Sequence, residues 1–236
     1  MALLDLIKHR KSVRDFLDRS VEREKIMMCL EAARLAPSES NSQPWRFIVV
    51  DDKELKNKLC DAAFGGVYWI NTFCKTAPVI VVVISEKSKF LARIGGMFRG
   101  TKYYLIDIGI AIEHFVLEAE DLGLGTCWIG WFNERGVKSV LNIPRDKKID
   151  ILIALGYYDR EKLGQEHGRE PMNKIASFDS YSLIREYRLQ DKASQAVVSF
   201  NPGGENSEQV SRLAGCDHYW RAYRAGHFMG RGGAIG

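Results

Sequence analysis

The sequence lacks the patterns that mark membrane proteins, secreted proteins, disulfide-rich proteins and zinc proteins. No stretch approaches the eighteen or so consecutive apolar residues of a membrane-spanning helix, and the N-terminus lacks the apolar core of a signal peptide. The five cysteines are widely spaced, form no CxxC pair and show no ligand-like pairing with histidine. An odd, scattered set of this kind favours reduced thiols over a disulfide framework or a zinc site. We therefore expect a cytoplasmic protein with no metal site and no membrane partner.

A strong excess of one charge is also missing. Lys and Arg number 34 against 30 Asp and Glu, a formal net charge of +4, which is too even to demand a nucleic acid as partner. With 236 residues, of which 46% are hydrophobic, the chain can fill the core of one large domain. We expect that domain over residues 1–200. Residues 201–236 contain eight glycines and few aliphatic residues, which predicts an extended or partly disordered tail.

Helical and strand-like patterns alternate from about residue 22 to residue 157. Apolar residues at helical spacing predict helices, and short apolar runs predict strands. The expected helices cover residues 22–36, 53–64, 102–122 and 134–141, and the expected strands cover residues 46–50, 79–84, 125–129 and 149–155. The helix over 102–122 is apolar around most of its circumference, which predicts that it is buried.

A dense basic segment, Arg10-Lys11-Ser12-Val13-Arg14, lies close to the N-terminus. In an extended chain the side chains alternate between two faces, so Arg10, Ser12 and Arg14 project together. Two guanidinium groups and a hydroxyl on one face match a phosphate monoester, because Arg presents paired donors to phosphate oxygens. An isolated run of this kind also occurs as a solvated basic turn, so other elements have to decide between the two interpretations.

The segment after the first expected helix, residues 36–45, is rich in amide and hydroxyl side chains. It contains Pro37, Ser38, Asn41 and Gln43 ahead of a Pro-Trp pair. Asn and Gln offer both donors and acceptors, which suits the mixed edge of a heteroaromatic ring such as the pyrimidine ring of a flavin. The alternative interpretation is an ordinary polar turn before a strand.

These two elements, together with two later ones, resemble the nitroreductase family of FMN-dependent oxidoreductases. The later elements are the Trp-Ile-Gly-Trp-Phe segment at 128–132 and Gly-Arg-Glu-Pro at 168–171. The resemblance covers roughly residues 3 to 180, and four elements in the family's order are far more specific than one motif. It implies an α+β fold: a three-layer α/β/α sandwich with a mixed, mainly antiparallel central sheet, a long buried central helix and a homodimeric assembly.

The resemblance also implies the roles of single residues in an FMN site. Arg10, Ser12 and Arg14, joined by Arg169, would bind the phosphate and ribityl chain. Asn41 and Gln43 would lie near the flavin, often reaching it across a dimer interface. Ile129 and Gly130 would run along the isoalloxazine ring, where a backbone N–H stabilises the charge that follows hydride arrival at N5. The remaining residues assigned to the cofactor are Lys11, Pro37, Ser38 and Trp128.

Several of these residues have plainer interpretations. The aromatic rings near residue 128 suit core or interface packing, and Cys127 suits a small buried apolar residue better than a redox thiol. No side chain is assigned a catalytic role, because the flavin N5 carries the chemistry in this family. Residues 65–100 contain aromatic and cationic side chains and are the candidate for a substrate lid.

The implied activity is hydride transfer from NADH or NADPH to FMN, followed by reduction of a small acceptor in a ping-pong cycle. The acceptor would be a nitroaromatic, a quinone, an enone or a halogenated phenol. No GxGxxG fingerprint follows a strand, so the nicotinamide would stack over the flavin rather than occupy a Rossmann domain. Two alternatives remain open: a flavin-binding storage or sensor protein with little nicotinamide turnover, and a protein that contacts nucleic acid through its N-terminal cations and the arginines of the tail.

Overall fold

The computed structural model describes residues 2–86, 101–163 and 168–181. The chain divides into two compact units, Met1–Glu166 and His167–Gly236, and each is described by itself. The first unit holds the sheet and nearly all of the helices, whereas the described part of the second contains one short helix, α7 (Met172–Ile175). The expected boundary at residue 200 and the Gly-rich tail lie outside the described residues.

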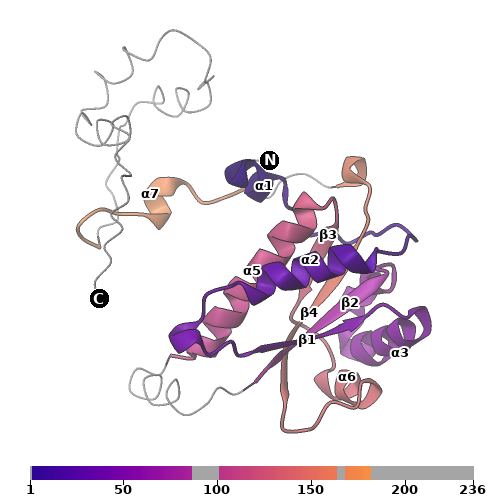
Figure 1. Cartoon of the computed structure of the whole chain (residues 1–236). Helices are drawn as coiled ribbons and strands as arrows, with labels where there is room; N and C mark the ends of the chain where they lie inside the picture. Colours follow the sequence, from indigo (N-terminus) through magenta and orange to yellow (C-terminus); the bar gives the residue numbers. More distant parts are fainter. Residues whose placement is uncertain (1, 87–100, 164–167, 182–236) are drawn as a thin grey trace, which may run out of the picture. The chain divides into compact units, whose positions relative to one another are not determined.

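The first unit is built on a four-stranded sheet in the order β1-β2-β4-β3 (Figure 1). The strands are β1 (Trp45–Val50), β2 (Val79–Ser85), β3 (Gly125–Ile129) and β4 (Lys148–Gly156), and every pair is antiparallel. A parallel bridge between Ser12 and Thr126 adds the N-terminal segment to the outer edge of β3. The sheet is therefore mixed but mainly antiparallel, as expected.

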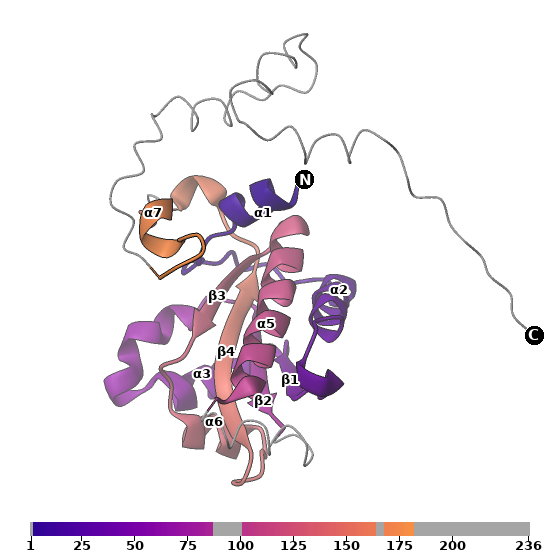
Figure 2. The same cartoon turned by 90° about the vertical axis from the view of Figure 1, so that its left-hand side faces the viewer.

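Both faces of this sheet are covered by helices. Figures 1 and 2 show α2 (Arg23–Arg34) and α5 (Tyr103–Asp121) on one face, and α3 (Lys53–Phe64) and α6 (Glu134–Val140) on the other. Central strand β2 is buried along its whole length. Its residues alternate between the two cores, because successive side chains of a strand point to opposite faces. The expected three-layer arrangement is confirmed.

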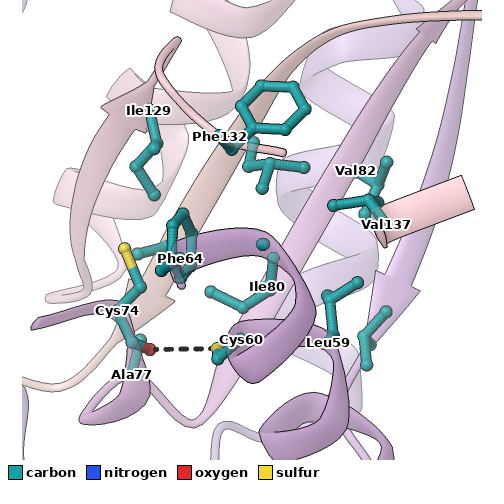
Figure 3. Close-up of a cluster of buried hydrophobic side chains, with 14 of the residues drawn as sticks. Leu59, Cys60, Phe64, Cys74, Ala77, Ile80, Val82, Ile129, Phe132 and Val137 are labelled. Atoms are coloured by element: carbon teal, nitrogen blue, oxygen red, sulfur yellow. Dashed lines mark hydrogen bonds between the residues drawn. The ribbon is translucent and has the colours of Figure 1, made fainter. Parts of the chain in front are cut away.

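The core on the α3 and α6 face contains aliphatic, aromatic and cysteine side chains (Figure 3). Leu59, Phe64 and Val137 come from the two helices, and Ile80 and Val82 meet them from β2. The other core packs α2 and α5 against the opposite face of the same strands, with Phe115 of α5 fully buried. Apolar burial from both sides explains the continuous apolar runs at residues 79–84 of β2 and 151–155 of β4.

The helix ends follow local chemistry that the sequence indicated. Asn133 caps α6 by accepting a hydrogen bond from the backbone N–H of Gly136 (3.1 Å). Gly123 follows the end of α5 with φ of +76°, a left-handed conformation that glycine adopts without a Cβ penalty. No helix in the described ranges has the combination of length and apolarity that a bilayer span requires.

Three expectations need correction. A short helix that the sequence did not predict, α1 (Leu3–His9), precedes the basic segment. Helix α5 is not buried all round within one chain, since Leu105 and Ile106 are 42% and 52% exposed. Residues 65–100 cannot form one lid, because Val79–Ser85 within them is the buried strand β2. Only the 3-10 helix η2 (Gly66–Lys75) remains as a described candidate, and residues 87–100 lie outside the described part.

Candidate cofactor site

The basic segment lies extended along the free edge of β3. It leaves α1 at Arg10, whose N–H donates to the carbonyl of Leu6 (3.0 Å), and three residues later the N–H of Val13 donates to the carbonyl of Thr126 (2.9 Å). Val13 is 1% exposed and anchors the segment in the core. Ser12 and Arg14 on either side of it are exposed, which is the alternation expected for an extended strand. The segment is therefore docked, and it is not a solvated turn.

Gly125 makes this docking possible. A Cβ on Gly125 would lie 2.5 Å from Cγ2 of Val13 and 2.6 Å from Cδ1 of Tyr158, closer than such atoms approach in proteins. Tyr158 is itself fixed, because its hydroxyl lies 3.4 Å from both carboxylate oxygens of the buried Glu120 and accepts from Arg160 (3.0 Å). The backbone of Gly125 therefore lies between the side chains of Val13 and Tyr158, in a space that leaves no room for a side chain at position 125.

The cations of the segment act on one buried and one half-buried acidic group. Burial raises the pKa of the Cys127 thiol, and the charge of Arg14 opposes that rise. Burial also raises the pKa of Glu113 on α5, and the charges of Arg10 and His114 oppose it. Nη1 of Arg14 lies 3.5 Å from the carbonyl oxygen of Ser12, a long contact that leaves most of its donors available. Lys11 is half-buried.

The amide-rich loop between α2 and β1 is ordered by its own side chains. Ser38 Oγ accepts from the N–H of Gln43 (3.0 Å), and Nε2 of Gln43 donates to Oδ1 of Asn41 (2.9 Å). Asn41 and Gln43 are exposed, as is Pro37, while Ser38 is half-buried. The loop therefore presents two linked amides to the outside on a closed backbone turn, η1 (Glu39–Asn41).

Backbone strain concentrates in this same loop. Ser40, Asn41 and Gln43 have φ of +50°, +53° and +46°, so three residues of four adopt the left-handed conformation without being glycine. Such conformations persist only where the surroundings over-determine them, and they cluster at functional sites. An ordinary polar turn does not need this strain, which favours the interpretation of the loop as a binding element.

A residue that the sequence did not reveal supports the loop from below. Asp107 of α5 is 5% exposed, and its Oδ1 accepts from the N–H of Glu39 (3.1 Å) while its Oδ2 accepts from Oγ of Ser42 (3.4 Å). One signal in the sequence could have drawn attention to Asp107: it is the one charged residue between Tyr103 and Ile112 of a very apolar helix. Its partner segment, 68 positions away, could not be read from that pattern.

The end of β3 offers open backbone. Ile129 is buried, Trp128 is 38% exposed, and a Cβ on Gly130 would meet no atom within 4 Å among the residues that the structure describes. The packing of those residues does not require glycine at 130, and the space beside it among them is open to a ligand. The next residue, Trp131, is 61% exposed and receives a hydrogen bond at its carbonyl from Nδ2 of Asn71 (2.8 Å).

Aromatic side chains gather where η2 meets this strand end. The rings of Tyr68 and Trp131 pack edge to face, with centroids 6.2 Å apart. Val67, Trp69 and Ile70 of η2 are each more than 60% exposed. Surfaces of this kind mark ligand or partner contacts. The described part of the candidate lid is η2. It exposes apolar and aromatic side chains and contacts Trp131 through Tyr68 and Asn71.

The cysteines of the core are poor redox groups. Cys29, Cys60, Cys74 and Cys127 are free and buried. Burial raises the pKa of Cys29 to about 12 and that of Cys60 to about 11, and it also raises the pKa of Cys74. The thiol of Cys60 points at the carbonyl of Cys74 (3.8 Å, Figure 3). Since the thiolate is the reactive form, these groups serve packing.

The structure brings two of the expected elements together on β3 and leaves the amide-rich loop beside β1, the strand at the opposite end of the sheet. The segment at residues 10–14 and the strand end at 128–130 share β3, because one docks on its edge and the other closes it. Arg169 is exposed and belongs to the second compact unit, so its position is described apart from the others. The chemistry of these groups suits the three parts of FMN: guanidinium and hydroxyl groups suit its phosphate, the two amides suit its polar ring edge, and the open backbone at Gly130 suits its ring face.

The chain is similar to known proteins over most of its described length. The model of the nitroreductase family matches residues 7–157. A putative NADH dehydrogenase/NAD(P)H nitroreductase of Archaeoglobus fulgidus is 32% identical over 163 residues, which cover 67% of this chain and 87% of that protein. An iodotyrosine deiodinase of Thermotoga neapolitana is 29% identical over 180 residues, with 68% and 90% covered. The solved structure of an FMN-dependent nitroreductase from Clostridium difficile superposes with a TM-score of 0.60 at 28% identity, covering 75% of this chain and 99% of that one.

The fold and the family match define a flavoprotein oxidoreductase. More particularly, the chain belongs to the nitroreductase family, with FMN as its cofactor.

Proposed function

We propose that the chain takes hydride from NADH or NADPH and reduces a small aromatic or quinone-like acceptor, with both substrates using one pocket in turn. The observation that supports the proposal is the docking of the basic segment on β3, the strand that ends directly before Gly130. When bound, FMN supplies the chemistry, because its N5 accepts a hydride and releases electrons to a second substrate.

Different residues would bind the phosphate and the ring of FMN. Arg10, Ser12 and Arg14 would hold the phosphate with charge-assisted hydrogen bonds, and Lys11 and Arg169 would add positive charge around it. Asn41 and Gln43 would meet the polar edge of the ring, with Gln43 held by its bonds to Ser38 and Asn41 and with Pro37 at the start of the loop. The backbone at Ile129 and Gly130 would offer an N–H toward the ring, with Trp128 beside it.

The pocket would exclude water with aromatic groups instead of acting through an acid or base. Trp131 and Tyr68, whose rings pack edge to face, would form an apolar wall next to Gly130, and Trp69 is exposed on the same 3-10 helix as Tyr68. Such a wall favours flat, aromatic substrates, including nitroaromatics and halogenated phenols. The similarity to an iodotyrosine deiodinase supports the inclusion of halogenated phenols among the acceptors to be tested.

A homodimer would complete this site. Leu105 and Ile106 of α5 are exposed in the single chain, and α1, which contacts α5, exposes Leu3, Leu4 and Ile7. Exposed apolar side chains on neighbouring helices mark an association surface. The second copy would cover them, which is the setting that the all-round apolarity of α5 requires.

The experiment is a sequence of three measurements on purified protein. A visible spectrum with flavin bands, and release of FMN by heat, would establish the cofactor in this chain. Steady-state assays with NADH and NADPH against a nitroaromatic, a quinone and an iodinated phenol would then give the preferred pair. A flavin-loaded protein that turns over none of these pairs would favour the storage or sensor function and contradict the proposal.

A further inference from the structure

Asp107 of α5 binds the amide-rich loop through two hydrogen bonds. The carboxylate is almost completely buried, and each of its oxygens receives one hydrogen bond from the loop. The donors are the backbone N–H of Glu39 and the hydroxyl of Ser42, which lie on either side of Asn41. One side chain of α5 therefore fixes both ends of the turn that presents the amide.

The loop needs this support because its backbone is strained. The bonds from Asn41 N–H to Ser38 O (3.0 Å) and from Ser42 N–H to Glu39 O (2.9 Å) close the turn internally. They do not tie the turn to the rest of the fold. The link to α5 is made by Asp107, and bonds to a charged, buried acceptor are stronger than bonds between neutral groups. A left-handed run of polar residues without such a link would relax toward ordinary turn conformations.

We propose that Asp107 is a positioning residue for the flavin ring: it holds Asn41 and Gln43 in their cofactor-binding arrangement before FMN arrives. This inference rests on the proposed function for the contact between loop and ring. Asp107 would strengthen FMN binding by preorganisation, because a loop that is already ordered loses less conformational entropy when the ligand binds. The loss of Asp107 would therefore appear as weaker FMN binding more than as an altered chemical step.

A simple structural role for Asp107 would give a different pattern, and a matched control separates the two. Glu134 of α6 also uses its carboxylate to tie two segments together: its Oε1 accepts from the N–H of Ile149 (3.1 Å), and it pairs with Lys138 (2.9 Å) and Lys148. It lies in the helix layer on the opposite face of the sheet from α5 (Figure 2). Its loss should lower stability without touching the loop.

The test measures the dissociation constant of FMN by fluorescence quenching on apoprotein, with the melting temperature of each apoprotein beside it. Asp107→Ala should weaken FMN binding about tenfold or more, since two bonds to a charged group are lost. Asp107→Asn keeps an acceptor for Glu39 N–H and should restore affinity to within about threefold. Ser42→Ala, a milder change, should weaken binding about twofold to fivefold. Glu134→Ala should lower the melting temperature and leave the dissociation constant unchanged.

Three results would overturn the inference. They are unchanged FMN affinity in both Asp107→Ala and Ser42→Ala, no recovery in Asp107→Asn, or an equal loss of affinity in Glu134→Ala. If Asp107→Ala does not fold, Ser42→Ala and Asp107→Asn decide alone. Failure of the wild-type apoprotein to bind FMN would instead contradict the proposed function itself, and would be seen before any variant is compared.

Discussion

Gly125 and Val13 touch so closely that no side chain fits between them: a Cβ at position 125 would lie 2.5 Å from Cγ2 of Val13. This contact joins the start of β3 to the middle of the basic segment. Because the segment continues to Arg14 and begins at Arg10, the contact sets where both guanidinium groups lie. A packing relationship in the core thus controls the candidate phosphate site.

Gly125→Ala should therefore weaken FMN binding. The added methyl group would push Val13 or Tyr158 away, at a cost of about 1–3 kcal/mol for an overpacked core site, and displace the segment that carries the cations. We expect the dissociation constant of FMN to rise about tenfold, measured on apoprotein.

Gly136→Ala is the control for that substitution. Its Cβ would lie 2.4 Å from the carbonyl oxygen of Ala62 at the contact between α3 and α6, a clash as severe as that at Gly125. It should lower the melting temperature by a similar amount while the FMN affinity of the folded protein stays at the wild-type value. Equal affinity losses in both variants would refute the link between Val13 and the cofactor.

Arg10→Ala and Arg14→Ala should each lower FMN occupancy. Each substitution removes charge-assisted hydrogen bonds to a phosphate, which predicts about a tenfold or greater loss of affinity. The difference in affinity between each variant and the wild type should be smaller for riboflavin, which has no phosphate. Arg34→Ala is the control, because Arg34 is exposed on α2 and pairs with Glu31. Wild-type occupancy in both site variants would show that the segment does not hold the phosphate.

Helix and strand boundaries could be predicted closely where a local pattern decided them. The structure places a helix at Lys53–Phe64 and a strand at Gly125–Ile129, the ranges that the pattern indicated. Helix α1 was missed because it has seven residues and buries only Leu6, which leaves too short a pattern. The exposure of Leu105 and Ile106 was missed because apolarity does not distinguish burial in a core from burial at an interface.

The elements of the candidate site could be proposed from the sequence, but the contacts that support them could not. Arg10, Ser12, Asn41 and Gln43 belong to recognisable motifs, and the structure shows them in an extended edge segment and a strained loop. The roles of Asp107 and Gly125 depend on contacts between positions far apart in the sequence. Such contacts follow from the packing of α5 and β3 and have no local signature.

Acid should weaken the fold partly through Glu134. The lysine side chains of Lys148 and Lys138 and the N–H of Ile149 hold its pKa at about 2 against the opposing effect of burial. A carboxylate with a lowered pKa stabilises the folded state above its ordinary pKa of about 4.5, and this stabilisation is lost as the pH falls toward 2.

Glu134→Gln should therefore lower the free energy of unfolding at pH 7 by about 1–2 kcal/mol and by much less near pH 2. Denaturant unfolding at several pH values measures both. A difference between variant and wild type that stays constant from pH 7 to pH 2 would contradict the ion-pair account.

The buried cysteines should not react in the folded protein. In a Cys216→Ala background the remaining thiols are Cys29, Cys60, Cys74 and Cys127, all buried. We expect almost no reaction with a disulfide reagent at pH 8, and four equivalents after unfolding. Rapid native labelling of Cys127 would contradict its packing role and reopen a redox role beside the strand end.

The most direct test of the account is an anaerobic stopped-flow measurement on the FMN-loaded protein. Mixing with NADH or NADPH should bleach the flavin absorbance completely, and a second mixing with the preferred acceptor should restore it, at rates that account for steady-state turnover. In Arg14→Ala the same rates per bound flavin should persist while occupancy falls, since Arg14 is assigned to binding. Flavin that neither nicotinamide nucleotide bleaches would contradict the proposed function.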